Sequence, residues 1–206
     1  SMIDIMDNVS LEKTTSFKEG LTTANNDYFL RLWYEVPFSK SDYSITTNKT
    51  GNEKKWIPYN KGGAFRKWYG NRFFVANWSQ SGMKIKNYKG SSFRNASFQL
   101  KEGGTFSALS SASLSARYSE SGFAFDSKGT MFFSDKNLEN VIAFLNSNVC
   151  SKMLKVVCPT LDFRFGTIQQ LPFLVNENID IENVVSISKE DWNQIETSWD
   201  YKKNEL

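Results

Sequence analysis

A continuous 48-residue stretch, residues 54–101, carries the side chains with the clearest chemistry in this sequence. It holds eleven lysines and arginines, eleven aromatic residues and no aspartate or glutamate. A segment of this length with the average composition of the chain would contain about five acids, so their absence indicates a charge bias. Cations neutralise phosphates, while aromatic rings stack on bases or form a core. The stretch therefore predicts a polyanionic partner, with a nucleic acid as the first choice.

The modest net charge of +3 conceals a polarised molecule. Outside residues 54–101, 14 of the 25 basic residues remain against all 22 acids. Residues 175–206 alone carry eight acids and three lysines. We therefore expect a basic face set against an acidic remainder.

The densest motif is the block from Lys55 to Asn71, which reads KWIPYNKGGAFRKWYGN. It combines the three properties that a protein surface needs to bind DNA: phosphate neutralisation, close backbone approach and pairing with base edges. The candidates for phosphate neutralisation are Lys61, Arg66 and Lys67, and Gly62 and Gly63 would allow close backbone approach. The candidates for pairing with base edges are Asn60, Arg66 and Asn71. Tyr69 would pack on sugar or base. Arg72, Lys84, Lys86 and Arg94 continue the basic surface. The alternative is a solvated basic loop whose aromatic residues are merely core.

Two further segments contain candidate contacts to phosphates or bases. Small hydroxyl and amide side chains between Gly20 and Arg31 can bind phosphates or bases, and the candidates there are Thr22, Thr23, Asn25 and Arg31. Five serines between residues 107 and 115 could line a phosphate contact with Arg117. The alternatives are an ordinary start of a strand and ordinary serine-rich turns.

Enzyme signatures are missing from the sequence. It contains no histidine, which excludes zinc sites and nucleophile arrangements that need one. It has no Walker phosphate loop, and its four prolines are never adjacent, so it lacks the Asn/Asp-Pro-Pro-aromatic loop of amino-methyltransferases of DNA. Cys150 and Cys158 are expected to be buried thiols rather than a disulfide. No run approaches the roughly 18 apolar residues of a membrane span, so we expect a cytoplasmic location.

Short aromatic and β-branched runs separated by Gly, Asn and Ser predict strands. The expected strands are residues 28–36, 73–78, 84–88, 98–100, 123–125 and 131–133. Ser81-Gly82 and residues 126–129 are turn signals, which predict two hairpins: one joining residues 73–78 to 83–85, the other joining 123–125 to 130–133.

Apolar residues recur at three- and four-residue spacing from Leu138 to Val156, which predicts one long helix over about 137–157. A short capped helix is expected near Trp192, led by Ser188. The predicted fold class is α+β, with twisted and mainly antiparallel sheets, this long helix and a short C-terminal helical tail. We expect residues 1–174 to form one domain excised from a larger protein, and residues 175–206 to form an acidic tail.

Several motifs resemble a known family. They are the block from Trp56 to Asn71, GLTTAN at 20–25 with FLRLWYEV at 29–36, GFAFDS at 122–127, FLNS at 144–147 and PTLDF at 159–163. Together they look like the C-terminal target recognition domain, of the TaqI-like specificity type, of adenine-specific DNA methyltransferases in BREX phage-defence systems and related type II restriction-modification enzymes. The resemblance covers residues 10–200. Ala64 and Ala24 depart from the Glu and Gly that are common in relatives.

The resemblance implies a function for the chain. It would recognise double-stranded DNA and position an adenine-N6 methyltransferase domain that lies N-terminally in the same polypeptide. S-adenosylmethionine would then bind that missing catalytic domain, and this chain would hold no cofactor or metal and perform no catalysis, while the parent could also cleave DNA. The alternatives are a module for single-stranded DNA or RNA, or a protein-interaction domain with an acidic partner.

Overall fold

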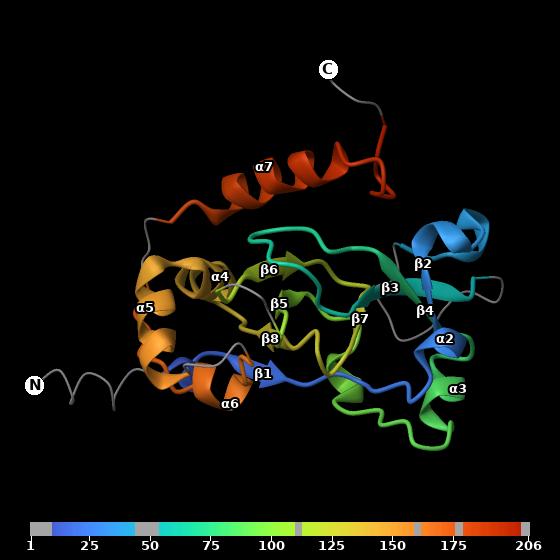
Figure 1. Ribbon diagram of the computed structural model, residues 1–206, viewed down its shortest axis with the longest axis horizontal. Helices are drawn as coiled ribbons and strands as arrows, with labels where there is room; N and C mark the ends of the chain where they lie inside the picture. Colours follow the sequence, from blue (N-terminus) through green and yellow to red (C-terminus); the bar gives the residue numbers. More distant parts are fainter. Residues whose placement is uncertain (1–9, 44–53, 110–112, 159–161, 176–178, 203–206) are drawn as a thin grey trace, which may run out of the picture.

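The computed structural model describes residues 10–43, 54–109, 113–158, 162–175 and 179–202, which form two four-stranded sheets surrounded by short helices (Figure 1). The α+β class is therefore confirmed. Both sheets are mainly antiparallel, as the sequence predicts.

The first sheet has the strand order β1-β8-β5-β6. Its strands are β1 (Ser16–Lys18), β8 (Met131–Phe133), β5 (Gly103–Phe106) and β6 (Ala116–Ser119). Phe17, Phe106 and Phe132 are buried in one hydrophobic core with residues of the helices α4 (Leu138–Asn146) and α5 (Asn148–Val157). The edge strand β6 is important for the site, because the loop that follows β3 pairs with it.

The second sheet has the order β2-β4-β3-β7. Its strands are β2 (Leu30–Leu32), β4 (Phe74–Asn77), β3 (Trp56–Asn60) and β7 (Ala124–Phe125). All five residues of β3 are buried, and β7 is its parallel neighbour. A separate core lies on this sheet and includes Leu21, Tyr59 and Trp78.

Short helical turns connect the strands. They are η1 (Leu11–Lys13), α2 (Asn26–Phe29), η2 (Trp33–Glu35), η3 (Phe38–Lys40), α3 (Met83–Lys86), η4 (Ala96–Phe98) and α6 (Phe165–Ile168). Figure 1 places α2 and α3 together at the end of the molecule opposite α5. No helix in the described part of the chain has the length and hydropathy needed to cross a bilayer.

Three strand predictions are wrong or too long. Residues 84–88 begin inside α3, and residues 96–98 form η4 rather than a strand. Only Leu30–Leu32 of the predicted strand 28–36 forms a strand, because α2, capped by Asn25, comes just before it and η2 just after it. Apolar runs this short do not distinguish a strand from a buried helical turn.

Neither predicted hairpin exists. After β4 the chain enters α3 through Gln80, Ser81 and Gly82, all of which have positive φ. The strands β7 and β8 follow one another in sequence but belong to different sheets, β7 pairing with β3 and β8 with β1 and β5. The turn at 126–129 therefore joins the two sheets, which sequence patterns do not reveal.

The predicted helix 137–157 is two helices, α4 (Leu138–Asn146) and α5 (Asn148–Val157). Ser147 between them is extended and accepts a hydrogen bond from the backbone N–H of Cys150, so it caps α5. The apolar stripe is also interrupted, because Val149 and Val156 are exposed. Both cysteines are free thiols. Cys150 is buried, and burial raises its pKa to about 12, whereas Cys158 is only partly buried.

The C-terminal helix α7 (Ile181–Asn193) starts earlier than predicted, because Asp180 rather than Ser188 caps it. It crosses above β6 and the loop that follows β3 (Figure 1). Trp192 is the buried anchor near its end and packs edge-on against Phe73 at 5.1 Å between ring centres.

Gly20 is a position where a side chain should be costly. A Cβ there would lie 1.9 Å from the backbone oxygen of Phe125, and that backbone is fixed within the second sheet. We expect Gly20→Ala to lower the free energy of unfolding by about 1–3 kcal/mol in a denaturant titration. Gly166→Ala is the control, because nothing lies within 4 Å of its would-be Cβ. Equal stability of the two variants would contradict the close packing of Gly20.

Candidate nucleic-acid interface

Two segments far apart in sequence meet at the α2–α3 end of the molecule. Thr22 and Ser92 exchange both backbone hydrogen bonds, at 2.8 and 2.9 Å. Asn25 caps α2 with its side-chain oxygen and donates from Nδ2 to the Tyr88 hydroxyl at 3.1 Å. The predicted polar cluster around residue 22 and the second half of the basic stretch therefore share one surface.

Exposed cations lie on this surface. Ile85 of α3 is buried beneath the second sheet, so the neighbouring Lys84 and Lys86 face solvent. Lys89 and Arg94 are also exposed. Glu19 forms an ion pair with Arg94 at 2.7 Å, and both side chains remain well exposed, so this pair is weak and easily exchanged for another anion.

A glycine turn lies near the same cluster. Gly62 and Gly63 follow β3 with positive φ, which favours glycine. A Cβ at Gly62 would lie 3.1 Å from the backbone oxygen of Lys128, so the turn packs closely on the 126–129 turn. Ser127 in that turn lies 3.5 Å from the Thr22 hydroxyl, which connects the glycine turn with the α2–α3 end. Lys61 is half-buried, and its ammonium lies over the Phe74 ring.

Four predicted contacts have buried side chains. Asn60 donates to Ser119 at 2.8 Å, and Asn71 donates to the backbone oxygen of Ala64 at 2.8 Å. Thr23 donates to Asn26 at 2.7 Å, and Tyr69 is 1% exposed. In this conformation these side chains hold loops in place and do not reach solvent.

Two predicted cations, Arg31 and Arg117, are occupied by internal contacts. Arg31 donates to the backbone oxygens of Asp27 and Leu30. Arg117 on β6 is fully buried and donates to the backbone oxygen of Arg66 at 3.2 Å and to the Ser107 hydroxyl at 3.3 Å. Burial, reinforced by the neighbouring charges of Arg72 and Arg66, lowers the Arg117 pKa to about 10. The side chain is still charged at neutral pH.

Arg72 belongs to a charged network that the sequence did not reveal. Its Nη1 donates to Glu120 at 2.5 Å, and Lys189 of α7 donates to the other Glu120 oxygen at 2.8 Å. Burial alone would raise the Glu120 pKa, but the two cations outweigh it and hold the pKa below its usual value. Glu120 therefore joins β6, the loop and α7.

Helix α7 covers Arg66, and Lys67 is occupied by α4. Asp191 forms an ion pair with Arg66 at 2.5 Å, and the Arg66 guanidinium lies 5.0 Å from the ring centre of Trp192. A Cβ at Gly70 would lie 2.7 Å from Trp192, so the glycine makes room for this ring. Lys67 is turned inward and donates to the backbone oxygen of Asn146 at 2.7 Å.

Asn146 connects the end of α4 with β6. Its buried side chain both accepts from the Ala116 N–H and donates to the Ala116 oxygen, each at 2.9 Å. We expect Asn146→Ala to lower the free energy of unfolding by roughly 2 kcal/mol, because the buried Ala116 N–H loses its side-chain partner, while the Ala116 oxygen keeps its bond from the Trp68 N–H.

A chemical denaturation series tests this prediction. The matched control is Asn183→Ala, at an exposed position of α7. A loss for Asn146→Ala no larger than that of the control would contradict the assigned role.

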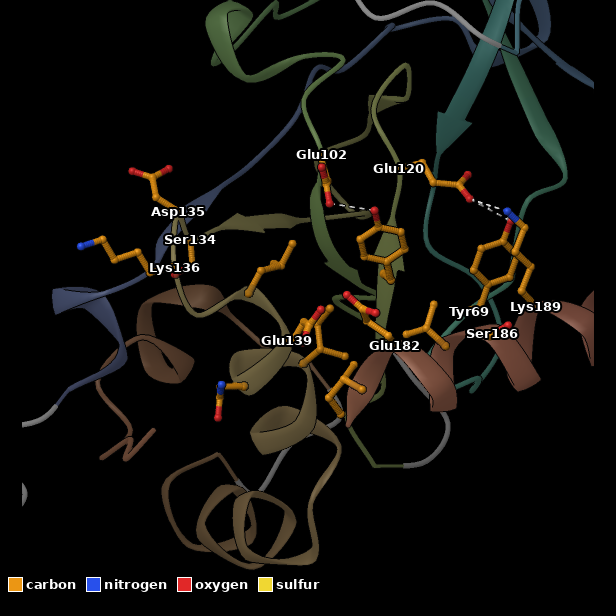
Figure 2. A pocket seen from close by; sticks show the side chains of 16 residues that line it. Tyr69, Glu102, Glu120, Ser134, Asp135, Lys136, Glu139, Glu182, Ser186 and Lys189 are labelled. Carbon is orange, nitrogen blue, oxygen red and sulfur yellow. Dashed lines mark hydrogen bonds and ion pairs between the residues drawn. The ribbon is translucent and has the colours of Figure 1, made fainter. Parts of the chain in front are cut away.

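A pocket of about 720 Å³ lies between α4, β6 and α7 (Figure 2). Five carboxylates and two lysines line it, the carboxylates being Glu102, Glu120, Asp135, Glu139 and Glu182. Burial and the charges of Glu182 and Asp180 raise the Glu139 pKa, which indicates mutual repulsion. This acidic surface would repel phosphates, so it is a poor nucleic-acid contact.

Sequence reasoning missed several residues of the α2–α3 surface. Tyr28 and Tyr88 are exposed, and their rings are stacked at 6.3 Å and 18°. Lys89 and Lys128 are exposed as well. Lys89 lies in the acid-free stretch that the sequence singled out, whereas Lys128 has no signal of its own. Within the described ranges, no group of three metal-ligating side chains could hold an ion.

The geometry thus defines an α+β domain with one group of exposed cations at the α2–α3 end and an acidic pocket on the α4–α7 side. No family model matches the sequence. The chain is 42% identical over 209 residues to the adenine-specific methyltransferase PglX of Lacticaseibacillus casei (strain Zhang), covering 95% of this chain. It is 36% identical over 195 residues to the adenine-specific methyltransferase BrxX of Escherichia coli O9:H4 (strain HS), covering 91% of this chain.

The matched region is a small part of each relative. It spans 17% of PglX and 16% of BrxX. The chain is therefore homologous to a segment of adenine-specific methyltransferases over nearly its whole length, and it spans about a sixth of their length.

Proposed function

We propose that this chain is a sequence-specific recognition module for double-stranded DNA, which positions an adenine-N6 methyltransferase domain in a larger protein of BREX-type phage defence or restriction-modification. The observation that supports it most is the α2–α3 surface. There, exposed Lys84, Lys86, Lys89 and Arg94 lie in the segment whose Tyr88 and Ser92 contact Asn25 and Thr22. The similarity to adenine-specific methyltransferases supports the biological setting.

The surface offers both kinds of contact that such a module needs. The four cations would neutralise phosphates and fix the register of the duplex. The hydroxyl of Thr22 and the amide of Asn25 would lie against base edges, and the turn at Gly62 and Gly63 would allow the backbone to come close to the DNA. Asn60, Thr23, Asn71, Tyr69, Arg72 and Arg117 would hold loops and strands of the domain in place and would not contact DNA directly.

The same proposal assigns catalysis and DNA recognition to different parts of the larger protein. S-adenosylmethionine and methyl transfer would belong to the remainder of the larger protein, and this chain would carry neither. Its partners would be duplex DNA and that catalytic domain, in the cytoplasm. Residues 1–174 would form the recognition unit, with the acidic tail from residue 175 held on it by α7 through Arg66 and Glu120.

Fluorescence anisotropy with a labelled duplex at rising salt tests duplex binding. We expect the logarithm of the affinity to fall linearly with the logarithm of salt concentration, by about 0.9 for each phosphate contact. The absence of binding to any duplex at low salt would overturn the proposal.

A module for single-stranded DNA or RNA is the second candidate, and the stacked exposed pair Tyr28 and Tyr88 favours it. Exposed rings bind unpaired bases of any sequence by stacking. Competition between single-stranded and duplex DNA of equal length separates the two functions. Preference for the single strand, lost in Tyr88→Ala, would favour the second.

A further inference from the structure

A second cavity, of about 400 Å³, lies where the segment after α7 meets the sheets. Three aromatic side chains line it, from Tyr43, Phe123 and Trp199, together with the charged side chains of Arg72, Glu120 and Lys189. Its volume is at the lower end of the range for small-molecule pockets, about 300–1,000 Å³, so a single ring system with its substituents would fill it.

Arg72 carries a donor that nothing in the described chain satisfies. The side chain is 4% exposed and stacks between Tyr69 and Phe123, at 3.8 and 4.6 Å from their ring centres. Its Nη1 donates to Glu120, but the buried Nη2 has no hydrogen-bond partner among the described residues. Leaving a buried donor unsatisfied costs about 1–3 kcal/mol, so a small movement of the guanidinium toward the cavity, where Nη2 could donate to an acceptor atom, would recover that cost.

The walls are suited to a flat ligand. The Trp199 ring lies 4.8 Å from Tyr43 and 6.1 Å from Phe123, with interplanar angles of 38° and 34°. Rings this close already pack on one another, so a flat ligand would stack beside Trp199 rather than between the rings, and such stacking is largely independent of substituents.

The charges of the cavity nearly balance. Arg72 and Lys189 are offset by Glu120 and Asp200, so a strongly charged ligand has no advantage. The Lys189 ammonium and the exposed Asp200 carboxylate offer a further donor and an acceptor. A neutral planar ligand with both acceptors and donors on its edge would satisfy them.

We propose that this cavity binds a nucleobase. The ring would stack beside Trp199, a ring nitrogen or carbonyl oxygen would accept from Nη2 of Arg72, and an exocyclic N–H would donate to Asp200. The base would come either from a free nucleoside or from an unpaired position in DNA, which share this chemistry. The inference rests on the cavity alone and not on duplex binding, so the two proposals can fail separately.

Isothermal titration with four nucleosides, and with two hairpin duplexes that differ by a single bulged base, tests the proposal. We expect one or both of two results. The full chain binds a nucleoside, or it binds the bulged hairpin more tightly than the perfect hairpin. Binding of the nucleoside alone identifies a free ligand as the source, and a preference for the bulge alone identifies DNA.

Trp199→Ala should weaken this base-dependent binding by about tenfold, because one stacking ring is lost. Tyr34→Ala, an exposed aromatic outside the cavity, should leave it unchanged. Thermal unfolding shows that both variants are folded, and Arg72 is left intact because it also stabilises the fold. Failure of the wild-type chain to bind any nucleoside or to prefer the bulge, or equal binding by Trp199→Ala, would overturn the proposal.

Discussion

Replacing Lys84, Lys86 and Lys89 together by glutamine is expected to weaken duplex binding by about two orders of magnitude near 0.1 M salt. The three side chains are exposed on and beside α3. If each contacts one phosphate, the slope of log affinity against log salt should become shallower by roughly 2.7, because each contact contributes about 0.9. Anisotropy titrations at several salt concentrations measure both quantities.

The matched control is the triple glutamine variant of Lys136, Lys152 and Lys155. These lysines are also exposed, and they lie on or beside α4 and α5, at the opposite end of the molecule (Figure 1). The control has the same net charge as the α3 variant, so a general charge effect would weaken both equally. Equal weakening would show that the α2–α3 surface is not the contact.

Glu120→Gln is expected to lower the free energy of unfolding by about 3 kcal/mol at neutral pH. Glu120 is the carboxylate bonded to Arg72, whose side chain is 4% exposed, and the substitution leaves that guanidinium buried without its counter-charge. Breaking a fully buried ion pair costs about 3–5 kcal/mol. The expected loss lies at the lower limit of this range because the Glu120 side chain is 35% exposed, so solvent screens its charge.

Acid should have the same effect as the substitution. The folded pKa of Glu120 lies below its ordinary value, so its contribution to stability is complete above the unfolded pKa and is lost as pH falls through the folded one. The difference in unfolding free energy between wild type and Glu120→Gln should therefore be constant above about pH 5 and shrink below about pH 4.

Glu182→Gln is the control for this pair of predictions. Glu182 lines the same acidic pocket, but it is exposed, and its charge raises the Glu139 pKa by repulsion. Its replacement should leave stability unchanged or slightly higher at neutral pH. A pH-independent difference for Glu120→Gln, or an equal loss in both variants, would contradict the assigned network.

The general class of the fold follows from sequence patterns, but its topology does not. The α+β class, β4 and the strand character of residues 124–125 and 131–133 are confirmed. That β7 and β8 belong to different sheets depends on long-range pairing, which leaves no local pattern. The helical break after Asn146 was also missed, because the apolar spacing continues past it.

The break has a physical reason that only the structure shows. At Ser147 the chain leaves the helical conformation, and the Asn146 backbone oxygen accepts from Lys67. The Asn146 side chain in turn bonds Ala116 of β6. A polar residue at the end of an apolar helix was readable in the sequence, but its partners lie 30 and 79 residues away.

The candidate interface was also only partly predictable from the sequence. Exposed Lys84, Lys86 and Arg94 lie where a basic surface was expected, since the absence of acids leaves them few partners nearby in sequence. Arg66 is covered because α7 brings Asp191 from the far end of the chain, and Lys67 is turned inward to the Asn146 backbone oxygen. Composition identifies cations, but it does not show which of them the fold itself uses.

Selection from a pool of random duplexes tests the central claim most directly. The chain would be incubated with the pool at moderate salt, and the retained DNA sequenced after several rounds. The account predicts enrichment of one short motif, and loss of that enrichment in the triple α3 variant. Retention without any enriched motif, or no retention at all, would contradict sequence-specific recognition of duplex DNA by this domain.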